Sequence, residues 1–572
     1  MKSTGPGVGR GQATRVEHLG NIEIPRPGDP ATRESLRVIG YGLFRRGSVN
    51  RVDVLIDGHH AGNARLGLPS PDLRNSPALG KNPAASVSGF EWLAGPADLP
   101  DEPDRVTLEV LVTSTEGKTF RMSRDLWLSP PEPRFEDTLG YAAHRRHEVD
   151  EIVLCRSSPK GEGVRLLAFT HRLDHGGAQR YFFEQIRYLM RDPHLRCTVV
   201  APLDGFWRRR LETIGVEVHL TGYPVAGVTE YESAVAQLAA WMTHHRFDAV
   251  YVNTLDSFIG ADVADRLGLP VMWKIHESFL LPNWWVVAHG GARHPYVFER
   301  LEKALSRASA LIFAADATKR LFEPYAAPSR MVTAPYGLEL DDIDTFRERC
   351  EPARLERLRS AYPEDALLIL CLGTVNARKA QAVLAQAFAQ VASKHPNAHL
   401  VLVGDQGGSY STGIQRYVKD AGLKKRCHLI PVTSDAYFWH EVADIFVLSS
   451  DIESSPISIL EAMAFETPVI ASRVFGVPEL IEDGRNGYLC EPNDVIDLAR
   501  CLDRVLSARP EERRRVAQAG ASRVRRRHDP DRYARSLRRL LQQLVQDADA
   551  TPSWEDEPPS PSAGALEALK HT

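Results

Sequence analysis

The pattern of apolar and polar positions changes twice along the chain, and each change predicts a domain boundary. From residue 32 to residue 128 apolar and polar residues alternate, most clearly over residues 106–120, and turns such as Asp57-Gly58 separate the runs. Alternation with a period of two is typical of half-buried antiparallel strands. We therefore expect a small all-β, sandwich-like domain over residues 32–128.

After residue 160 the pattern switches to short apolar runs separated by amphipathic helical segments. This alternation predicts an α/β fold with parallel sheets, in two successive Rossmann-like halves, residues 161–345 and 346–547. An amphipathic, arginine-rich helix over residues 531–545 should end the second half. The predicted strands are residues 164–170, 197–201, 217–220, 249–253, 271–275, 310–314 and 331–334 in the first half, and residues 366–375, 399–404, 428–432, 445–449, 468–471 and 487–490 in the second.

Three further segments lack the hydrophobic residues that a core requires. Residues 1–31, 129–160 and 548–572 are rich in Gly, Pro or charged residues. Such segments cannot bury enough apolar surface to offset the entropy lost on ordering. We expect a disordered tail at each end of the chain and a linker between the β domain and the first α/β half.

Composition excludes several classes of protein. The 572 residues carry a formal net charge of -4, which argues against a general nucleic-acid binder. The seven cysteines show no Cys-x-x-Cys spacing, so we expect reduced core thiols. The first residues lack the apolar core of a signal peptide, and no apolar run approaches the ~18 residues of a membrane span. These features predict a cytoplasmic protein.

Two tryptophans of the predicted β domain, Trp92 and Trp127, allow two interpretations. An exposed indole ring could stack on a sugar, which would make the β domain a carbohydrate-binding unit. Large aromatic side chains are, however, mostly buried in folded proteins. We therefore expect these tryptophans to belong to the core.

Residues 443–472 hold the strongest candidate site. The apolar run of residues 443–450 predicts a buried strand, and Pro456 suits the first turn of the helix that follows. Glu453 and Glu461 therefore flank one strand-to-helix turn. Ligands of α/β sheets bind at the carboxyl ends of strands, and a carboxylate can accept two hydrogen bonds from a vicinal diol. On spacing alone, two solvated glutamates would be the simpler interpretation.

The surrounding residues favour a ligand site because they match a known family. The matching segments are Glu453, Glu461-Ala-Met-Ala, Pro468-Val-Ile-Ala, Gly476-Val-Pro-Glu479 and Asn486-Gly. Over roughly residues 164–543 the chain resembles the family 4 retaining glycosyltransferases, which belong to the group 1 type and have the GT-B fold. The resemblance implies two Rossmann-like domains facing a cleft, with a nucleotide-diphosphate sugar bound by the second domain. The β domain weakly resembles accessory domains found in front of bacterial polysaccharide-building transferases.

The resemblance also implies roles for residues of the second half. Glu461 should bind the ribose hydroxyls, and Glu453 the hydroxyls of the transferred sugar. Lys379 lies at the family's diphosphate-contacting lysine and should stabilise the leaving group. Thr374 occupies the position usually held by arginine, so Arg378 is the candidate for the missing charge. The other donor-binding candidates in this half are Gly373, Gly404, Thr433, Ser455, Pro456, Ile457 and Ser458. Ala380 also departs from the family, which has glycine there.

In the first half, the loop with Gly176 and Gly177 should let the backbone approach the donor's phosphates or the acceptor, with Asp174 and His175 at the same mouth. His276 matches a histidine that the family directs at the transferred sugar. A lone histidine at a strand end is otherwise more often structural.

The sequence therefore predicts a retaining, metal-independent glycosyltransferase that needs no cofactor. It would transfer a sugar, hexosyltransferase-like, to a glycan or glycoconjugate, as in cell-surface polysaccharide biosynthesis. Two alternatives stay open: a non-catalytic carbohydrate-binding or scaffold protein, and a nucleotide-sugar epimerase or hydrolase. The basic clusters at residues 513–515 and 523–527 fit either a solvated helix face or peripheral contact with an anionic membrane. The nucleotide, the sugar, the acceptor and the oligomeric state are not predicted.

Overall fold

The computed structural model describes most of the chain. The described residues are 17–26, 31–32, 36–76, 79, 81–95, 98–100, 102, 104–129, 163–289, 294–433, 436–547 and 551–552. Most of the expected tails and nearly all of the expected linker lie outside these residues, so the predictions for those masked parts are not assessed.

The N-terminal part folds into two sheets that share one hydrophobic core. One sheet has the order β1-β3-β7-β6, and the other has the order β2-β9-β8-β4-β5. Pairing is antiparallel throughout, except between β2 and β9. The strands are β1 (His18–Ile24), β2 (Ala31–Thr32), β3 (Leu36–Phe44), β4 (Val49–Ile56), β5 (His59–Asn63), β6 (Arg65–Leu68), β7 (Gly89–Ala94), β8 (Arg105–Ser114) and β9 (Thr119–Ser129). The expected sandwich-like domain is confirmed.

Two predictions about this domain are wrong. Strand β1 lies within the segment expected to be a tail, because it pairs with β3 and buries Ile22 to 3% exposure. Trp127 is 66% exposed, whereas Trp92 lies in the core as expected. On β9 the buried positions are Phe120, Leu126 and Leu128, so the alternation of the strand directs Trp127 to the opposite face.

The first α/β half contains a parallel seven-stranded sheet of order β12-β11-β10-β13-β14-β15-β16. Its strands are β10 (Val164–Phe169), β11 (Leu195–Ala201), β12 (Glu217–Leu220), β13 (Ala249–Asn253), β14 (Val271–Ile275), β15 (Ala310–Phe313) and β16 (Met331–Thr333). Its helices are α2 (Gly177–Leu189), α3 (Phe206–Thr213), α4 (Val228–His245), α5 (Phe258–Arg266), α6 (Leu281–His289), α7 (Pro295–Arg307) and α8 (Asp316–Arg320).

The second α/β half contains a parallel six-stranded sheet of order β19-β18-β17-β20-β21-β22. Its strands are β17 (Leu367–Leu372), β18 (Ala398–Asp405), β19 (Cys427–Pro431), β20 (Ile445–Leu448), β21 (Val469–Ser472) and β22 (Tyr488–Cys490). The helices that follow the first sheet are α9 (Leu340–Arg349), α10 (Pro352–Arg359), α11 (Gln381–Val391), α12 (Ser409–Asp420), α13 (Ala436–Val442), α14 (Ile457–Ala464), α15 (Val477–Leu480), α16 (Val495–Ser507), α17 (Pro510–Arg527) and α18 (Pro530–Gln546). Buried apolar runs form most strands of both sheets, as predicted for parallel sheets covered on two faces, whereas the edge strands β12 and β19 are more exposed.

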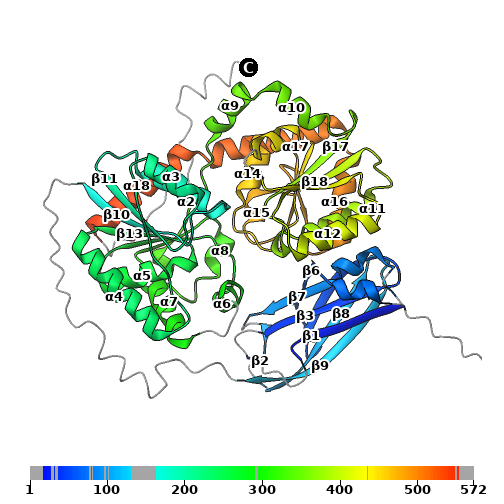
Figure 1. The fold of residues 1–572 in the computed structure, drawn as a ribbon, viewed down its shortest axis with the longest axis horizontal. Helices are drawn as coiled ribbons and strands as arrows, with labels where there is room; N and C mark the ends of the chain where they lie inside the picture. The colour runs from blue at the N-terminus through cyan, green and yellow to red at the C-terminus, as the bar shows by residue number, and fades with distance from the viewer. Residues whose placement is uncertain are drawn as a thin grey trace, which may run out of the picture.

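Two chain segments join the halves. Residues 334–339 lead from β16 to α9, and residues 528–529 lead from α17 back to α18; we call these two segments the hinge. Helix α18 packs against α2 and β13 of the first half, where Asp531 pairs with Arg191 at 2.9 Å. Figure 1 shows α18 on the first half while α17 stays on the second. The last helix therefore crosses back, as expected.

Two other expectations about the chain can be assessed. The six cysteines among the described residues are free, and four of them are buried. In the described parts of the chain, no helix combines the length and hydrophobicity needed to cross a membrane.

Candidate functional site

The candidate site is built from loops at the carboxyl ends of β17, β18 and β20 in the second half. Gly373 follows β17 with φ +142°, and Gly404 lies in β18 with φ +119°. A Cβ on Gly404 would come within 2.3 Å of the Gly373 carbonyl oxygen. Glycine at position 404 therefore lets the two strand ends approach each other closely.

Glu453 forms a buried carboxylate with two cationic partners. Its Oε1 accepts hydrogen bonds from Lys379 Nζ at 2.5 Å and from Arg378 Nη1 at 3.1 Å. Burial by itself would raise the pKa of Glu453, but Lys379 and Arg378 together hold that pKa below its ordinary value. The structure thus brings together Glu453, Lys379 and Arg378, three residues that the sequence assigned to donor chemistry.

Lys379 is held by a short turn of residues 377–379. The Asn376 side chain accepts the Lys379 N–H at 3.1 Å and caps this turn. Ala380 then adopts φ +51°, in the left-handed region that favours glycine. This chain therefore carries alanine in a conformation that glycine would adopt without strain. Thr374 is exposed, and its carbonyl oxygen accepts a hydrogen bond from Gln381.

Glu461 is paired across the two halves of the protein. It lies on α14, is 3% exposed, and accepts a hydrogen bond from Arg180 Nη1 of α2 at 2.7 Å. His440 Nε2 lies 3.6 Å from its second oxygen, and Arg180 also donates to the Tyr437 hydroxyl. Burial acts to raise the pKa of Glu461, yet Arg180 and His440 lower it to about 2.

Sequence reasoning missed Arg180. It lies four positions after Gly176, in the first turn of the helix that follows the glycine loop. The position of Arg180 after the glycine loop, at the mouth of the cleft, was the available sequence signal. The partner of Arg180, however, depends on how the two halves pack. The pair joins the glycine-loop helix to the helix that carries Glu461.

The glycine loop itself lies open at the start of α2. A Cβ on Gly177 would meet nothing within 4 Å, so the space in front of this helix end is free. Asp174 accepts a hydrogen bond from Gln179 at 3.0 Å, and the exposed His175 stacks on Phe206 at 4.1 Å. The N–H groups of a first helical turn have no intrahelical partners and can bind an anion or a hydroxyl.

Comparisons with known proteins agree with this arrangement. The model of group 1 glycosyl transferases matches residues 354–523, and that of a glycosyl transferase 4-like domain matches residues 176–337. A D-inositol 3-phosphate glycosyltransferase of Thermomonospora curvata is 30% identical over 310 residues, covering 51% of this chain and 70% of that protein. The chain belongs to the group 1 glycosyltransferases of family 4.

Other similar proteins are less identical to this chain or align with a smaller part of it. The D-inositol 3-phosphate glycosyltransferase of Thermobifida fusca is 30% identical over 287 residues, which cover 48% of this chain and 64% of that protein. The chain thus spans about two thirds of the length of such relatives. A crystal structure of Anabaena HepE in complex with UDP-glucose aligns with a TM-score of 0.56 at 20% identity, covering 66% of this chain and 99% of that one. This likeness supports the GT-B fold, with two Rossmann-like domains.

In this glycosyltransferase His276 is held by protein groups on both ring nitrogens. Nε2 lies 2.8 Å from Asn253 Oδ1, and Nδ1 contacts the Tyr336 hydroxyl. Because Asn253 Oδ1 can only accept, Nε2 donates to it and the Tyr336 hydroxyl donates to Nδ1. Burial, with the nearby Lys274 and His171, lowers the pKa of His276 well below its ordinary value. A neutral, fixed imidazole results, with both ring nitrogens engaged by protein groups.

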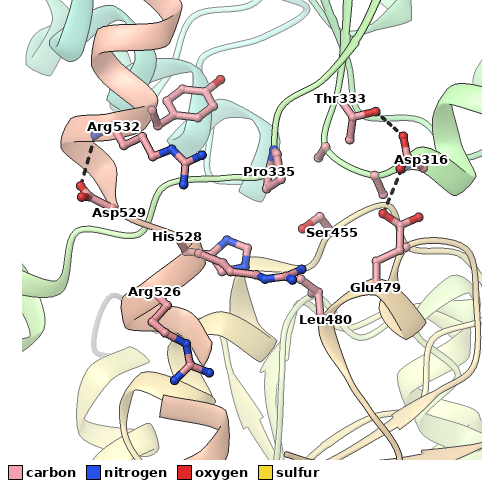
Figure 2. A pocket seen from close by; sticks show the side chains of 15 residues that line it. Asp316, Thr333, Pro335, Ser455, Glu479, Leu480, Arg526, His528, Asp529 and Arg532 are labelled. Atoms are coloured by element: carbon pink, nitrogen blue, oxygen red, sulfur yellow. Dashed lines mark hydrogen bonds between the residues drawn. The ribbon is translucent and has the colours of Figure 1, made fainter. Parts of the chain in front are cut away.

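A pocket of about 490 Å³ lies at the hinge of the glycosyltransferase. Figure 2 shows Arg526, His528 and Arg532 on one side of it, and Asp316 and Glu479 on the other. Among the donor-binding candidates, Ser455 lines this pocket, whereas Glu453 of the same turn meets Lys379. The turn between β20 and α14, residues 449–456, therefore faces both the hinge and the loop that carries Lys379.

The remaining candidates are placed more simply. Pro456 precedes α14, and Ile457 and Ser458 form its first turn beside Glu461. Thr433 follows β19, at the far edge of the sheet from β21 and β22. Across the described residues, no group of three or more His, Cys, Asp or Glu side chains is arranged to hold a metal ion.

Proposed function

We propose that the protein transfers a sugar from a nucleotide-diphosphate sugar to a glycan, lipid-linked or other glycoconjugate acceptor, with retention of the anomeric configuration. The observation that carries this proposal is the pair of buried carboxylates Glu453 and Glu461, each kept ionised by a cation and set on one strand-to-helix turn. Ionised carboxylates accept hydrogen bonds from sugar hydroxyls in both of their oxygens.

In this proposal the donor lies along the loops of the second half. Glu461 receives the ribose hydroxyls and Glu453 those of the transferred sugar, while the N–H groups at the start of α14 face the donor. Cleavage of the anomeric bond places negative charge on the leaving diphosphate. Lys379 and Arg378 then stabilise that charge, because fixed cations in a site that excludes water act strongly on the transition state.

Retention follows from a front-face reaction in this proposal. The acceptor hydroxyl attacks the anomeric carbon from the side that the diphosphate leaves, and a departing phosphate oxygen takes the hydroxyl proton. The bond to the diphosphate breaks as the new glycosidic bond forms, so no protein base is needed. His276, neutral and bound on both nitrogens, suits a positioning role at the sugar rather than proton transfer.

The similar proteins guide the choice of substrates. HepE was crystallised with UDP-glucose, and several relatives are named for the acceptor D-inositol 3-phosphate. We propose UDP-glucose and D-inositol 3-phosphate as the first donor and acceptor to test, and cell-surface polysaccharide assembly in the cytoplasm as the setting.

The test is nucleotide release from UDP, GDP and ADP sugars with EDTA present, using the wild type, Glu461→Ala and Lys379→Ala. Release from one donor that is lost in both variants supports the proposal, and NMR of the product reports the anomer. No release and no thermal shift with any donor would instead favour a carbohydrate-binding or scaffold protein. Conversion or hydrolysis of the donor without transfer to any acceptor would favour an epimerase or hydrolase.

A lipid-linked acceptor would bring the protein to an anionic membrane, and α17 carries arginines for such a peripheral contact. Two of them are engaged within the protein: Arg513 donates to the Ala508 carbonyl oxygen and Arg523 to Glu482. Arg514, Arg515 and Arg525 are exposed. Sedimentation with anionic vesicles that occurs at low salt and is lost at high salt supports this contact. Absence of binding at low salt removes it.

A further inference from the structure

The N-terminal β domain is built into the second half of the protein. Strand β6 and the short helix η2 (Pro83–Val87) pack against α11 and α12, and the apolar core continues from one domain into the other. Figure 1 shows the β domain (blue) directly against the second half (yellow). A shared core of this kind fixes the position of the β domain, in contrast to a module on a flexible linker.

Polar contacts fix the register of this interface. Ser86 Oγ donates to the Gly413 carbonyl oxygen at 3.2 Å, and the Ile496 N–H donates to Asn50 Oδ1 at 2.7 Å. Gly67, with φ +78°, lies so close that an added Cβ would come within 2.6 Å of the Ala382 Cβ. Ala382 lies in α11, three positions after Lys379, so the interface reaches the end of the loop that carries Lys379.

One ion pair extends from this interface to the candidate site. The guanidinium of Arg65, on β6, hydrogen-bonds the carboxylate of Asp451. Both side chains are largely buried, at 15% and 9% exposure. Asp451 belongs to the turn that carries Glu453, and its N–H donates to the Arg378 carbonyl oxygen at 3.0 Å. Burial raises the pKa of Asp451, and the positive charge of Arg65 opposes that rise.

The same turn holds Arg378 from its other side. The Arg378 side chain donates to the Ile452 carbonyl oxygen at 2.7 Å and to Glu453 at 3.1 Å. Asp451 therefore connects Arg65 to both the backbone of Arg378 and the turn that presents Glu453. A buried carboxylate that loses its cation must move toward water or take up a proton. Movement toward water would displace this turn, and a proton would change the hydrogen bonds that Asp451 can make.

We propose that Arg65 of the β domain is a positioning residue for the donor site, acting through Asp451 on Arg378 and Glu453. The proposal rests on the proposed function, since it assigns the β domain to donor turnover. It makes the β domain a structural part of the active site, and it distinguishes Arg65 from the residues that merely attach the domain.

The test compares two substitutions at the same interface. Arg65→Met removes the charge next to Asp451, whereas Asn50→Ala removes the contact with Ile496, which does not touch the turn. Arg37→Met is a second control, because Arg37 pairs with Glu91, as Arg65 does, and is 50% exposed. Hydrogen exchange should become faster in residues 376–380 and 449–455 of Arg65→Met alone. Unchanged exchange in these two segments overturns the proposal, whether or not the protein turns over a donor.

Kinetics at a temperature where all variants are folded give the second measurement. We expect Arg65→Met to lower kcat for donor turnover by about tenfold or more, since small displacements of catalytic groups cost rates of this order. Asn50→Ala and Arg37→Met should keep the wild-type kcat, and Arg65→Lys should recover part of the loss. If Arg65→Met and Asn50→Ala lost equal fractions of kcat, and these losses followed their thermal midpoints, Arg65 would have a structural role only. A wild type that turns over no donor contradicts the proposed function, while the exchange experiment still decides the role of Arg65.

Discussion

Arg180 and Glu461 lie 281 positions apart in the chain, yet their side chains form a 2.7 Å hydrogen-bonded ion pair across the two α/β halves. The pair joins the helix after the glycine loop to the helix that carries the proposed ribose-binding carboxylate. It therefore couples the relative position of the halves to the ionisation of Glu461, whose pKa it helps to lower to about 2.

This coupling can be measured with a double-mutant cycle of Arg180→Met and Glu461→Gln. We expect a coupling free energy of about 3 kcal/mol at pH 7, because breaking a buried pair leaves an uncompensated charge. The folded pKa of Glu461 lies below the ordinary value of 4.5, so this stabilisation is complete above pH 4.5 and is lost as the pH falls toward 2. Unfolding at pH 7 and at pH 3 measures the change.

An exposed pair provides the control for that cycle. Arg208 and Glu212 form an i,i+4 pair with 37% and 47% side-chain exposure. Its coupling should be much weaker than that of the buried pair, since solvent and side-chain entropy weaken exposed pairs. Similar coupling energies for the two pairs would contradict the bridging role of Arg180.

Lys379 should control the rate of donor turnover more than donor affinity. Its ammonium group lies beside Glu453. In the proposed function this group stabilises the leaving diphosphate. Lys379→Ala should lower kcat by about a hundredfold or more with a smaller change in KM, as expected when a group stabilises charge that develops in the transition state. Lys394→Ala, at an exposed lysine paired with Asp503, should behave as wild type. A variant whose KM alone changes would assign Lys379 to ground-state binding.

Most of the fold and part of the site followed from sequence pattern and family resemblance. Continuous apolar runs predicted the parallel strands, because both faces of those sheets are covered. The grouping of Glu453, Lys379 and Arg378 could be predicted from the sequence because all three follow strand ends at one edge of a sheet. Strand β1 was missed because it contributes one deeply buried residue, Ile22, among polar neighbours.

Contacts between domains were beyond prediction from the chain alone. Arg180 and Arg65 resemble ordinary surface arginines in sequence, and their carboxylate partners are 281 and 386 positions away. Such pairs depend on how complete domains pack, which local periodicity does not encode. The exposure of Trp127 likewise depended on the phase of β9 relative to the core rather than on residue type.

Acid should destabilise the protein through buried neutral histidines, of which His528 at the hinge is the clearest. Its Nδ1–H donates to the Tyr336 carbonyl oxygen at 2.6 Å, and burial lowers its pKa to about 4. A neutral buried histidine stabilises the fold above pH 6.5, and that contribution is lost as the pH falls toward 4. Between pH 7 and pH 5 the wild type should lose about 2 kcal/mol more than His528→Gln. His194 is exposed, so His194→Gln should lose as much stability as the wild type between pH 7 and pH 5, as measured by thermal unfolding. If His528→Gln also lost as much stability as the wild type, His528 would be excluded as the cause.

Ala380 offers the opposite kind of substitution, one that should stabilise the protein. Its φ of +51° costs an alanine roughly 1 kcal/mol, and glycine removes that strain while increasing the entropy of the unfolded chain. Because the two effects differ in sign, we expect Ala380→Gly to change the free energy of unfolding by about 0 to +1 kcal/mol and to leave donor turnover intact. Ala387→Gly, in the interior of α11, should instead destabilise by about 1 kcal/mol. If both substitutions destabilised the protein equally in chemical unfolding, the strain assigned to Ala380 would be absent, and the alanine would have to contribute through its methyl contacts.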